Sequence, residues 1–271
     1  MKKFVVVKQL LDATMRNHMN KYDAQPHRLT FFLPNTFTAL NMGCGFAAII
    51  MATKGLYYGA CMILILGAIF DSVDGRIARL TGTQSEFGEQ FDSISDVISF
   101  GMAPAFMIYF KYFQDLGRAG MIISFLYLLC GALRLARFNA NINKVPSNYF
   151  QGLPIPGAAI AIIGFIMVTL EFDFGMYRNY YAAAYVVFYA LLMISNIPFN
   201  SFKNSDYVRK NRRKVLALIL LILVMVFIYE KLMIFVLISA YVLGCMVYNI
   251  FSKDTKVEIF DWEDNDEENE S

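Results

Sequence analysis

The sequence predicts an all-α polytopic integral membrane protein with about eight transmembrane helices. Of its 271 residues, 57% are hydrophobic and only 17% are charged, whereas about 25% of a typical soluble domain is charged. The hydrophobic residues are gathered in runs of roughly 16–25 residues, the length that a helix needs to cross a bilayer. The basic residues fall mostly in alternate loops between these runs, as they do in membrane proteins of fixed orientation.

The chain is expected to begin with an interfacial segment and to continue into a helical core. Residues 1–33 mix apolar and basic side chains, which is typical of an amphipathic helix lying on the membrane, followed by a linker that ends at Pro34. Residues 34–200 hold the first six expected spans. These are residues 36–53, 56–78, 88–110, 119–138, 155–170 and 180–198.

The C-terminal third is expected to add a hairpin and a tail. Residues 201–252 form a basic loop and two further spans, 215–230 and 232–251, which are separated only by Glu230 and Lys231. Within the loop, the run from Arg209 to Lys214 either attracts anionic lipid or simply follows from the topology. Residues 253–271 are strongly acidic, and such a run is expected to stay disordered and solvated.

The distribution of basic residues predicts which side of the membrane each loop faces. Proteins retain lysine and arginine preferentially on the cytoplasmic side. With eight spans, both termini and the loop after the second span share the more basic side, so the protein is placed in the cell membrane with these parts in the cytoplasm. Only five of the 24 basic residues fall on the other side: Lys54, Lys111, Arg118, Arg178 and Lys231.

Four aspartates lie in or against the second and third expected spans, where a carboxylate costs about 2.5–3.5 kcal/mol even on lenient insertion scales. Asp71 and Asp74 share one face of a helix with Gly75 and Ala78, because consecutive residues are rotated by about 100°. Gly88, Asp92 and Asp96 follow one another at intervals of four, so they share one face too. A polar loop from Leu80 to Phe87 allows the two helices to return antiparallel, and both faces then meet near the cytoplasmic side.

Carboxylates placed so close together would repel one another unless a cation lay between them. An all-oxygen site suits Mg²⁺, Mn²⁺ or Ca²⁺, and four carboxylates suffice for two ions, an arrangement used for displacement at phosphorus. Gly75 and Gly88 leave room for a ligand near the backbone, and Arg79 is suited to pair with a phosphate. The stretch therefore predicts a site for a pyrophosphate-bearing substrate. The alternative is a water-filled pathway that transports divalent cations and catalyses no reaction. Such a pathway would not explain why Gly75, Ala78 and Arg79 accompany the aspartates.

The stretch from Asp71 to Asp96 reads D-S-V-D-G-R-I-A-R, eight further residues, and G-E-Q-F-D-S-I-S-D. It resembles the motif D-x-x-D-G-x-x-A-R-x(8)-G-x-x-x-D-x-x-x-D of the CDP-alcohol phosphatidyltransferase family, without departure at the defining positions. The resemblance implies a six-helix catalytic core formed by the first six spans, and cleavage of a CDP-activated lipid with release of CMP. It also implies two divalent metals, one held by Asp71, Asp74 and Asp92 and the other by Asp71, Asp92 and Asp96.

The same resemblance implies roles for the other motif residues. Gly75, Ala78, Arg79 and Gly88 would line the CDP site, and Asp96 at the end of the motif would take the proton from the acceptor hydroxyl. Near the start of the first span, Asn35 and Asn41 are candidates for nucleotide contacts. Helix capping and hydrogen bonding between helices are the alternatives for these two residues.

Three stretches outside the motif indicate the acceptor. They are L-P-N-T-F-T-A-L-N-M-G-C-G-F from Leu33, A-L-R-L-A-R-F-N from Ala132, and F-Q-G-L-P-I-P-G-A-A from Phe150. Together they resemble the branch of the family that joins L-serine to CDP-diacylglycerol and makes phosphatidylserine. Glycerol 3-phosphate and inositol phosphate are alternative acceptors, although a phosphorylated acceptor would need a denser basic pocket.

The residues around the end of the fourth span have chemistry that fits serine, which carries a carboxylate and an ammonium group. Arg134 and Arg137 are candidates for binding that carboxylate or a lipid phosphate, and Asn139 is a candidate for the ammonium. Arginines that only reach toward the membrane surface are the alternative. The expected partners are CDP-diacylglycerol, L-serine, the bilayer and, by resemblance to the family, a second copy of the chain; no nucleic acid is expected.

Overall fold

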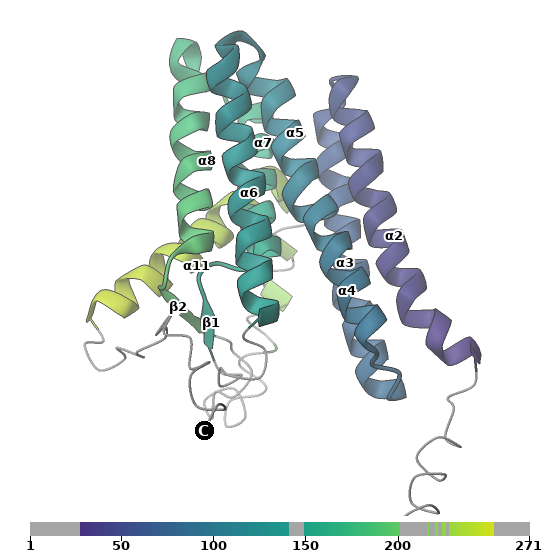
Figure 1. Cartoon of the computed structure of the whole chain (residues 1–271). Coiled ribbons are helices and arrows are strands. Elements are labelled where there is room, and N and C mark those ends of the chain that lie inside the picture. The colour runs from purple at the N-terminus through teal and green to yellow at the C-terminus, as the bar shows by residue number, and fades with distance from the viewer. Residues whose placement is uncertain are drawn as a thin grey trace, which may run out of the picture.

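The computed structural model describes residues 28–140, 149–200 and 228–251, with a few more helical positions between 216 and 225. Long helices dominate it, and most of them run side by side (Figure 1). Four helical stretches are long and apolar enough to cross a membrane: Phe32–Thr53, Glu86–Leu116, Arg118–Ala140 and Glu230–Asn249. The prediction of a helical, multi-pass membrane protein is therefore confirmed.

Helices α2 (Arg28–Thr53) and α3 (Tyr57–Thr81) form an antiparallel pair on one side of the bundle (Figure 1). Gly55 closes the short turn between them with a φ of 74°, a conformation that costs glycine little. Helix α3 is capped after Thr81 by Gly82, which has a left-handed φ of 64°. The hydroxyl of Ser85 then accepts a hydrogen bond from the backbone N–H of Gly88 at 3.1 Å and so begins α4 (Glu86–Asp96).

The third long helix is interrupted by two π-helical turns. It runs through α4, η1 (Val97–Met102), α5 (Ala103–Ile108), η2 (Tyr109–Phe113) and η3 (Gln114–Leu116). Pro104 lacks the N–H that would otherwise bond to the carbonyl of Phe100. The hydroxyl of Tyr127, from α6 (Arg118–Ala140), donates to that carbonyl instead, at 3.2 Å. The first π-helical turn, η1, begins directly after Asp96. The hydrogen bond from Tyr127 joins this turn to α6.

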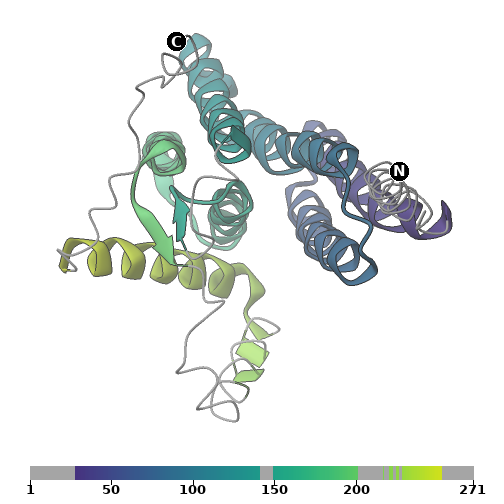
Figure 2. The same ribbon diagram turned by 60° about the horizontal axis from the view of Figure 1, so that its bottom comes forward.

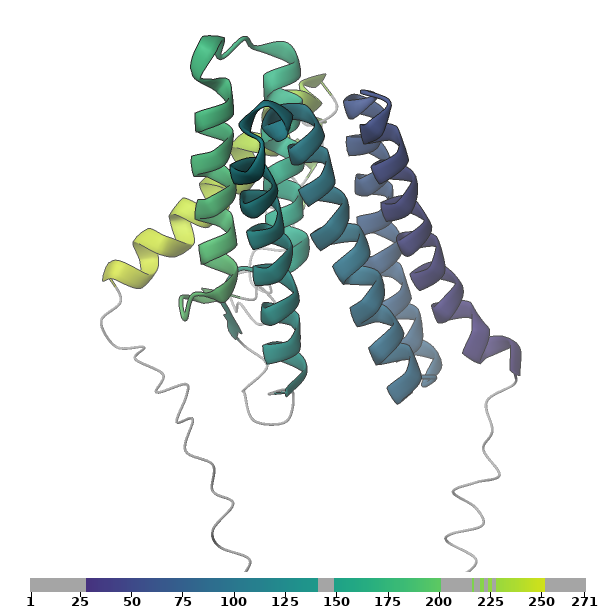
Figure 3. The same cartoon turned by 45° about the horizontal axis from the view of Figure 1, so that its top comes forward.

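Helix α7 (Ile155–Glu171) lies at the centre of the second half, beside α8 (Arg178–Ile194). Most of its side chains are buried, as expected of a helix that is apolar all round. Helix α11 (Glu230–Phe251) crosses it obliquely (Figure 3). A Cβ atom at Gly164 would lie 2.9 Å from the Cα of Phe235, so glycine is needed for this close crossing. Lys231 and Glu171 form an ion pair at 2.6 Å that joins the start of α11 to the end of α7.

A short antiparallel ribbon, absent from the all-α prediction, connects two loops. It pairs β1 (Tyr149–Gln151) with β2 (Pro198–Asn200), close to the end of α8 (Figure 2). Strands this short show no alternating pattern, and their partners are far apart in the sequence. Such pairing depends on the helices that bring the two segments together.

Large apolar side chains cover much of the outer surface, including Phe46 on α2, Ile122 on α6 and Val247 on α11. A soluble protein rarely exposes contiguous apolar areas of this kind, and here they provide the surface toward lipid. The buried core lies mainly between α5, α6, α7 and α8.

Helix α2 begins at Arg28 and contains Pro34, so it starts before the point where the linker was expected to end. Pro34 is the seventh residue of α2, and it lacks the N–H that would bond to the carbonyl of Thr30. The expected interfacial segment up to residue 27, the span 215–230 for the most part, and the acidic tail lie outside the described residues.

Candidate metal centre

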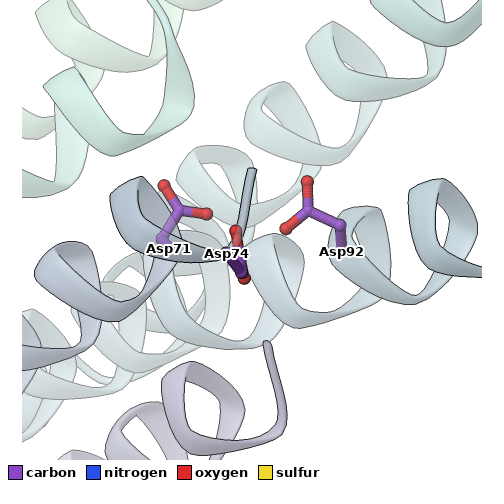
Figure 4. Close-up of side chains that lie close together, drawn as sticks. All are labelled: Asp71, Asp74 and Asp92. Carbon is purple, nitrogen blue, oxygen red and sulfur yellow. The ribbon is translucent and has the colours of Figure 1, made fainter. Parts of the chain in front are cut away.

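Three aspartates from two helices meet at one point of the bundle. Asp71 and Asp74 lie one turn apart on α3, and Asp92 lies on α4. One carboxylate oxygen from each falls within 4.8 Å of the others, and Figure 4 shows the three carboxylates turned toward a shared space. The predicted convergence of the two acidic faces is thus found in the structure.

Asp96 lies one helical turn beyond Asp92 and within hydrogen-bonding reach of Asp71. One oxygen of Asp92 and one of Asp96 are buried without a hydrogen-bond donor among the described residues. Within that part of the chain, the ion pair of Lys231 with Glu171 is the only salt bridge, so the aspartates form no direct ion pair with a lysine or arginine. Buried carboxylates of this kind coordinate metals or stay paired, and oxygen donors of this number suit a hard divalent cation.

Helix α2 holds the acidic helices in position through a threonine that the sequence analysis missed. The hydroxyl of Thr38 donates to Oδ2 of Asp74 at 2.8 Å, and both residues are buried. The backbone carbonyl of Thr38 accepts a hydrogen bond from the hydroxyl of Ser95 on α4, at 3.1 Å. The sequence did contain a feature that could have indicated Thr38: it lies three residues after Asn35, so the two residues share a helix face.

A polar cleft adjoins the aspartates. Its walls come from α2, from α3, from the loop after α3 and from the start of α4. Four residues predicted for the CDP site line it, and so do two of the aspartates: Asn35, Gly75, Ala78, Gly88, Asp74 and Asp92. Six lining residues were not predicted: Pro34, Thr38, Thr83, Gln84, Ser85 and Glu89.

The two predicted glycines serve this cleft differently. A Cβ atom at Gly75 would meet no atom within 4 Å, so the space beside that backbone is open. A Cβ atom at Gly88 would lie 3.2 Å from the hydroxyl of Ser85 and 3.5 Å from Oδ1 of Asn35. Gly75 therefore provides room for a ligand, while Gly88 allows α2 and the cap of α4 to approach each other.

Two further predicted residues lie elsewhere. The Nε of Arg79 donates to the carbonyl of Gly75 in its own helix at 2.9 Å, and the side chain is otherwise exposed. Asn41 is 0% exposed, and its amide lies against Gly67 on α3, where a Cβ atom would approach its Oδ1 to 3.0 Å. Neither atom of this amide has a hydrogen-bond partner among the described residues, so the alternative of hydrogen bonding between helices is not found for Asn41.

The three acceptor candidates all lie on the last turns of α6. Arg134 is only 6% exposed, its Nε has no hydrogen-bond partner among the described residues, and its guanidinium lies 5.4 Å from the ring centre of Phe138. The carboxylate of Asp96 is close enough to act on its charge. Asn139 donates from Nδ2 to the hydroxyl of Ser93 on α4 at 2.9 Å. The end of α6 thus faces the aspartates from the side opposite α2.

The third candidate, Arg137, is engaged with another helix. Its guanidinium donates to the carbonyls of Met193, Ile194 and Ser195 at 3.0–3.3 Å. It also lies 3.4 Å from Oδ1 of Asn196. The carbonyls at the end of a helix have no partner within the helix, so Arg137 caps the C-terminus of α8.

Together the fold and the site define a polytopic membrane protein with a partly buried carboxylate cluster suited to divalent metal. The cluster lies beside a cleft that a polar headgroup can enter. Residues 31–195 match the family model of CDP-alcohol phosphatidyltransferases, and the chain belongs to that family.

Several relatives are similar over most of this region. One is a CDP-diacylglycerol–serine O-phosphatidyltransferase from Helicobacter pylori, which is 36% identical over 200 residues, covering 73% of this chain and 82% of the relative. A protein of the same name from Methanocaldococcus jannaschii is 39% identical over 171 residues, covering 63% and 75% respectively. The archaetidylserine synthase of Methanothermobacter thermautotrophicus is 38% identical over 169 residues, covering 62% and 69%.

Proposed function

We propose that this protein transfers the phosphatidyl group of CDP-diacylglycerol to the hydroxyl of L-serine and so forms phosphatidylserine and CMP. The observation that carries the proposal is the group of Asp71, Asp74 and Asp92 beside a cleft lined by the other residues of the family motif. The names of the relatives support serine as the acceptor. Two of them are named as serine O-phosphatidyltransferases and the third as an archaetidylserine synthase.

The donor lipid is proposed to bind on the α2–α4 side. Gly75 and Ala78 leave the backbone of α3 accessible to the CDP group, and Asn35 offers an amide from α2. The side chain of Arg79 is exposed near the same turn and is proposed to turn toward a phosphate when the donor binds.

The acceptor is proposed to bind on the α6 side. The buried guanidinium of Arg134 carries a positive charge near Asp96 and is suited to the carboxylate of serine. Asn139 is fixed by Ser93 at the edge of the same space, with its amide oxygen available for the serine ammonium. Serine would thus enter between α6 and α4, opposite the CDP group.

The reaction is a displacement at the lipid-linked phosphorus. The serine hydroxyl oxygen forms the new bond to that phosphorus, the bond to the CMP oxygen breaks, and the leaving CMP keeps the electron pair. Asp96, at the far end of the motif from the CDP cleft, is proposed to take the hydroxyl proton on its carboxylate. Mg²⁺ or Mn²⁺, as two ions held by Asp71, Asp74, Asp92 and Asp96, would supply stabilisation of the negative charge on the phosphates.

The membrane arrangement is part of the proposal. It has eight spans, of which the first six form the catalytic core and the last two an added hairpin. Both termini and the site face the cytoplasm, where serine is available, and two copies pair as a homodimer. The even number of spans and the excess of basic residues on one side support this orientation.

The test is release of CMP by the purified protein in detergent. CDP-diacylglycerol is supplied with serine, glycerol 3-phosphate, inositol phosphate or no acceptor, and with Mg²⁺ or Mn²⁺. Release that depends on serine, with labelled serine recovered in lipid, is the expected result. Release with a phosphorylated alcohol alone would assign another acceptor, and no release with any alcohol would favour the transport of divalent cations.

The role of Asp96 is tested by Asp96→Asn, with Asp173→Asn as the matched control. Asp173 is an exposed aspartate in the loop before α8, where it accepts a hydrogen bond from the backbone of Gly175. We expect the first variant to fold and to lose CMP release, and the second to keep it. Normal turnover in the Asp96 variant would refute the proposed proton acceptor.

A further inference from the structure

We propose that Arg137 is a positioning residue that holds the acceptor side of the site by fixing the end of α6 to the end of α8. The inference rests on the proposed function, because it concerns how Arg134 and Asn139 are held against α4. It differs from the expectation that Arg137 itself binds the acceptor or a lipid phosphate.

The first argument is the set of contacts that Arg137 makes. Its planar guanidinium bonds to three successive backbone carbonyls, those of Met193, Ile194 and Ser195, at 3.0–3.3 Å. These carbonyls carry the negative end of the α8 dipole, where a cation is stabilised by about 0.3–1 kcal/mol or more. A guanidinium committed to these acceptors has little capacity left for a substrate.

The second argument is that another segment converges on the same carbonyls. Gly152 has a φ of 74°, and a Cβ atom there would lie 2.3 Å from the carbonyl oxygen of Met193, 2.9 Å from that of Ser195 and 3.0 Å from Nη2 of Arg137. The N–H of Leu153 donates to the carbonyl of Leu192 at 3.1 Å. Arg137, Gly152–Leu153 and the end of α8 therefore form one packed unit, here called the α6–α8 latch.

The third argument is where the latch lies along α6. Arg134 precedes Arg137 by three residues and Asn139 follows it by two, so all three belong to the same last turns. Asn139 reaches Ser93, the residue after Asp92, at 2.9 Å. A shift of these turns would move the acceptor side, whereas the CDP cleft would stay in place because its lining comes only from α2, α3, α4 and the loop between α3 and α4.

The experiment compares the KM of the acceptor with the KM of CDP-diacylglycerol in Arg137→Gln, Arg137→Lys and Gly152→Ala. We expect each variant to raise the acceptor KM by about tenfold or more, as small misplacements of catalytic groups do, and to leave the KM of CDP-diacylglycerol unchanged. Lysine does not rescue, because it cannot reproduce the planar fork of donors. Asn196→Ala removes one acceptor and should give a smaller change in the same constant.

Two controls match the changed residues. Arg118→Lys alters an exposed arginine at the opposite end of α6, and Gly43→Ala adds a methyl group in open space on α2, away from the latch. Both should keep wild-type constants. The double variant of Arg137→Gln with Gly152→Ala should be no worse than the more severe single variant, since both break the same latch.

Several outcomes would overturn the inference. They are restoration of the acceptor KM by lysine, multiplicative effects of the two changes, or an equal rise in the KM of CDP-diacylglycerol. The readout is the KM of whichever alcohol releases CMP with this protein. A result in which serine is not the acceptor is therefore distinguishable from a result in which the latch has no effect. If Arg137→Gln does not fold, Gly152→Ala and Asn196→Ala carry the comparison. If no alcohol releases CMP, additive losses of thermal stability in the double variant would refute the latch.

Discussion

Replacing Thr38 by valine tests whether α2 tunes the metal centre through a single hydrogen bond. Valine keeps nearly the same shape and removes only the hydroxyl that donates to Oδ2 of Asp74 at 2.8 Å. Thr38 is 3% exposed and Asp74 is 4% exposed, so water cannot readily replace the lost donor. Hydrogen bonds to charged groups contribute about 1.5–3 kcal/mol, and every 1.4 kcal/mol is about tenfold in affinity.

We therefore expect Thr38→Val to weaken the apparent affinity for Mg²⁺ or Mn²⁺ by about 10- to 100-fold, the range found for residues that orient metal ligands. The assay is CMP release as a function of metal concentration. Thr36→Val is the matched control, because the Thr36 hydroxyl donates to the carbonyl of Phe32 in its own helix and the side chain is exposed. An unchanged metal requirement in Thr38→Val, or an equal change in Thr36→Val, would refute the reasoning.

Three further predictions follow from the site. Gly75→Ala should raise thermal stability slightly, since alanine is favoured over glycine in a helix by about 0.5–1 kcal/mol, but should raise the KM of CDP-diacylglycerol because the methyl group enters the cleft. Gly43→Ala, also in open space on α2, should only stabilise. Asp92→Asn should reduce CMP release to the level of wild-type protein treated with a chelator. Added Mn²⁺ should restore CMP release in the chelator-treated wild type but not in the Asp92 variant. Arg134→Met should raise the KM of serine by about tenfold or more, from a lost charged hydrogen bond of about 1.5–3 kcal/mol, and an unchanged KM would remove Arg134 from the acceptor site.

The acidic helices show how far the sequence could be interpreted. The intervals between Asp71 and Asp74 and between Gly88 and Asp92 fix which residues share a helix face, because the rotation per residue is constant. The short polar loop between the helices then brings the two faces together, and the structure contains this cluster. Regular local geometry was sufficient for this part of the site.

Thr38 and Arg137 show where this reasoning ends. The partner of Thr38 is 36 residues away along the chain, and the partners of Arg137 are more than 50 residues away. A hydroxyl or a guanidinium in an apolar run has many possible partners, and helical periodicity does not choose among them. The same holds for the ribbon of β1 and β2, whose pairing depends on where α6 and α8 end.

The sequence by itself determined that this chain crosses a membrane and carries a family motif whose aspartates converge, because hydrophobic length and helical periodicity are local properties. Only the tertiary structure decided which side chains hold those aspartates, that Gly88 lies against Ser85 and Asn35, and that Arg137 caps α8. These features depend on how the helices are placed against one another. That placement follows from packing and from satisfying buried polar groups across the whole bundle.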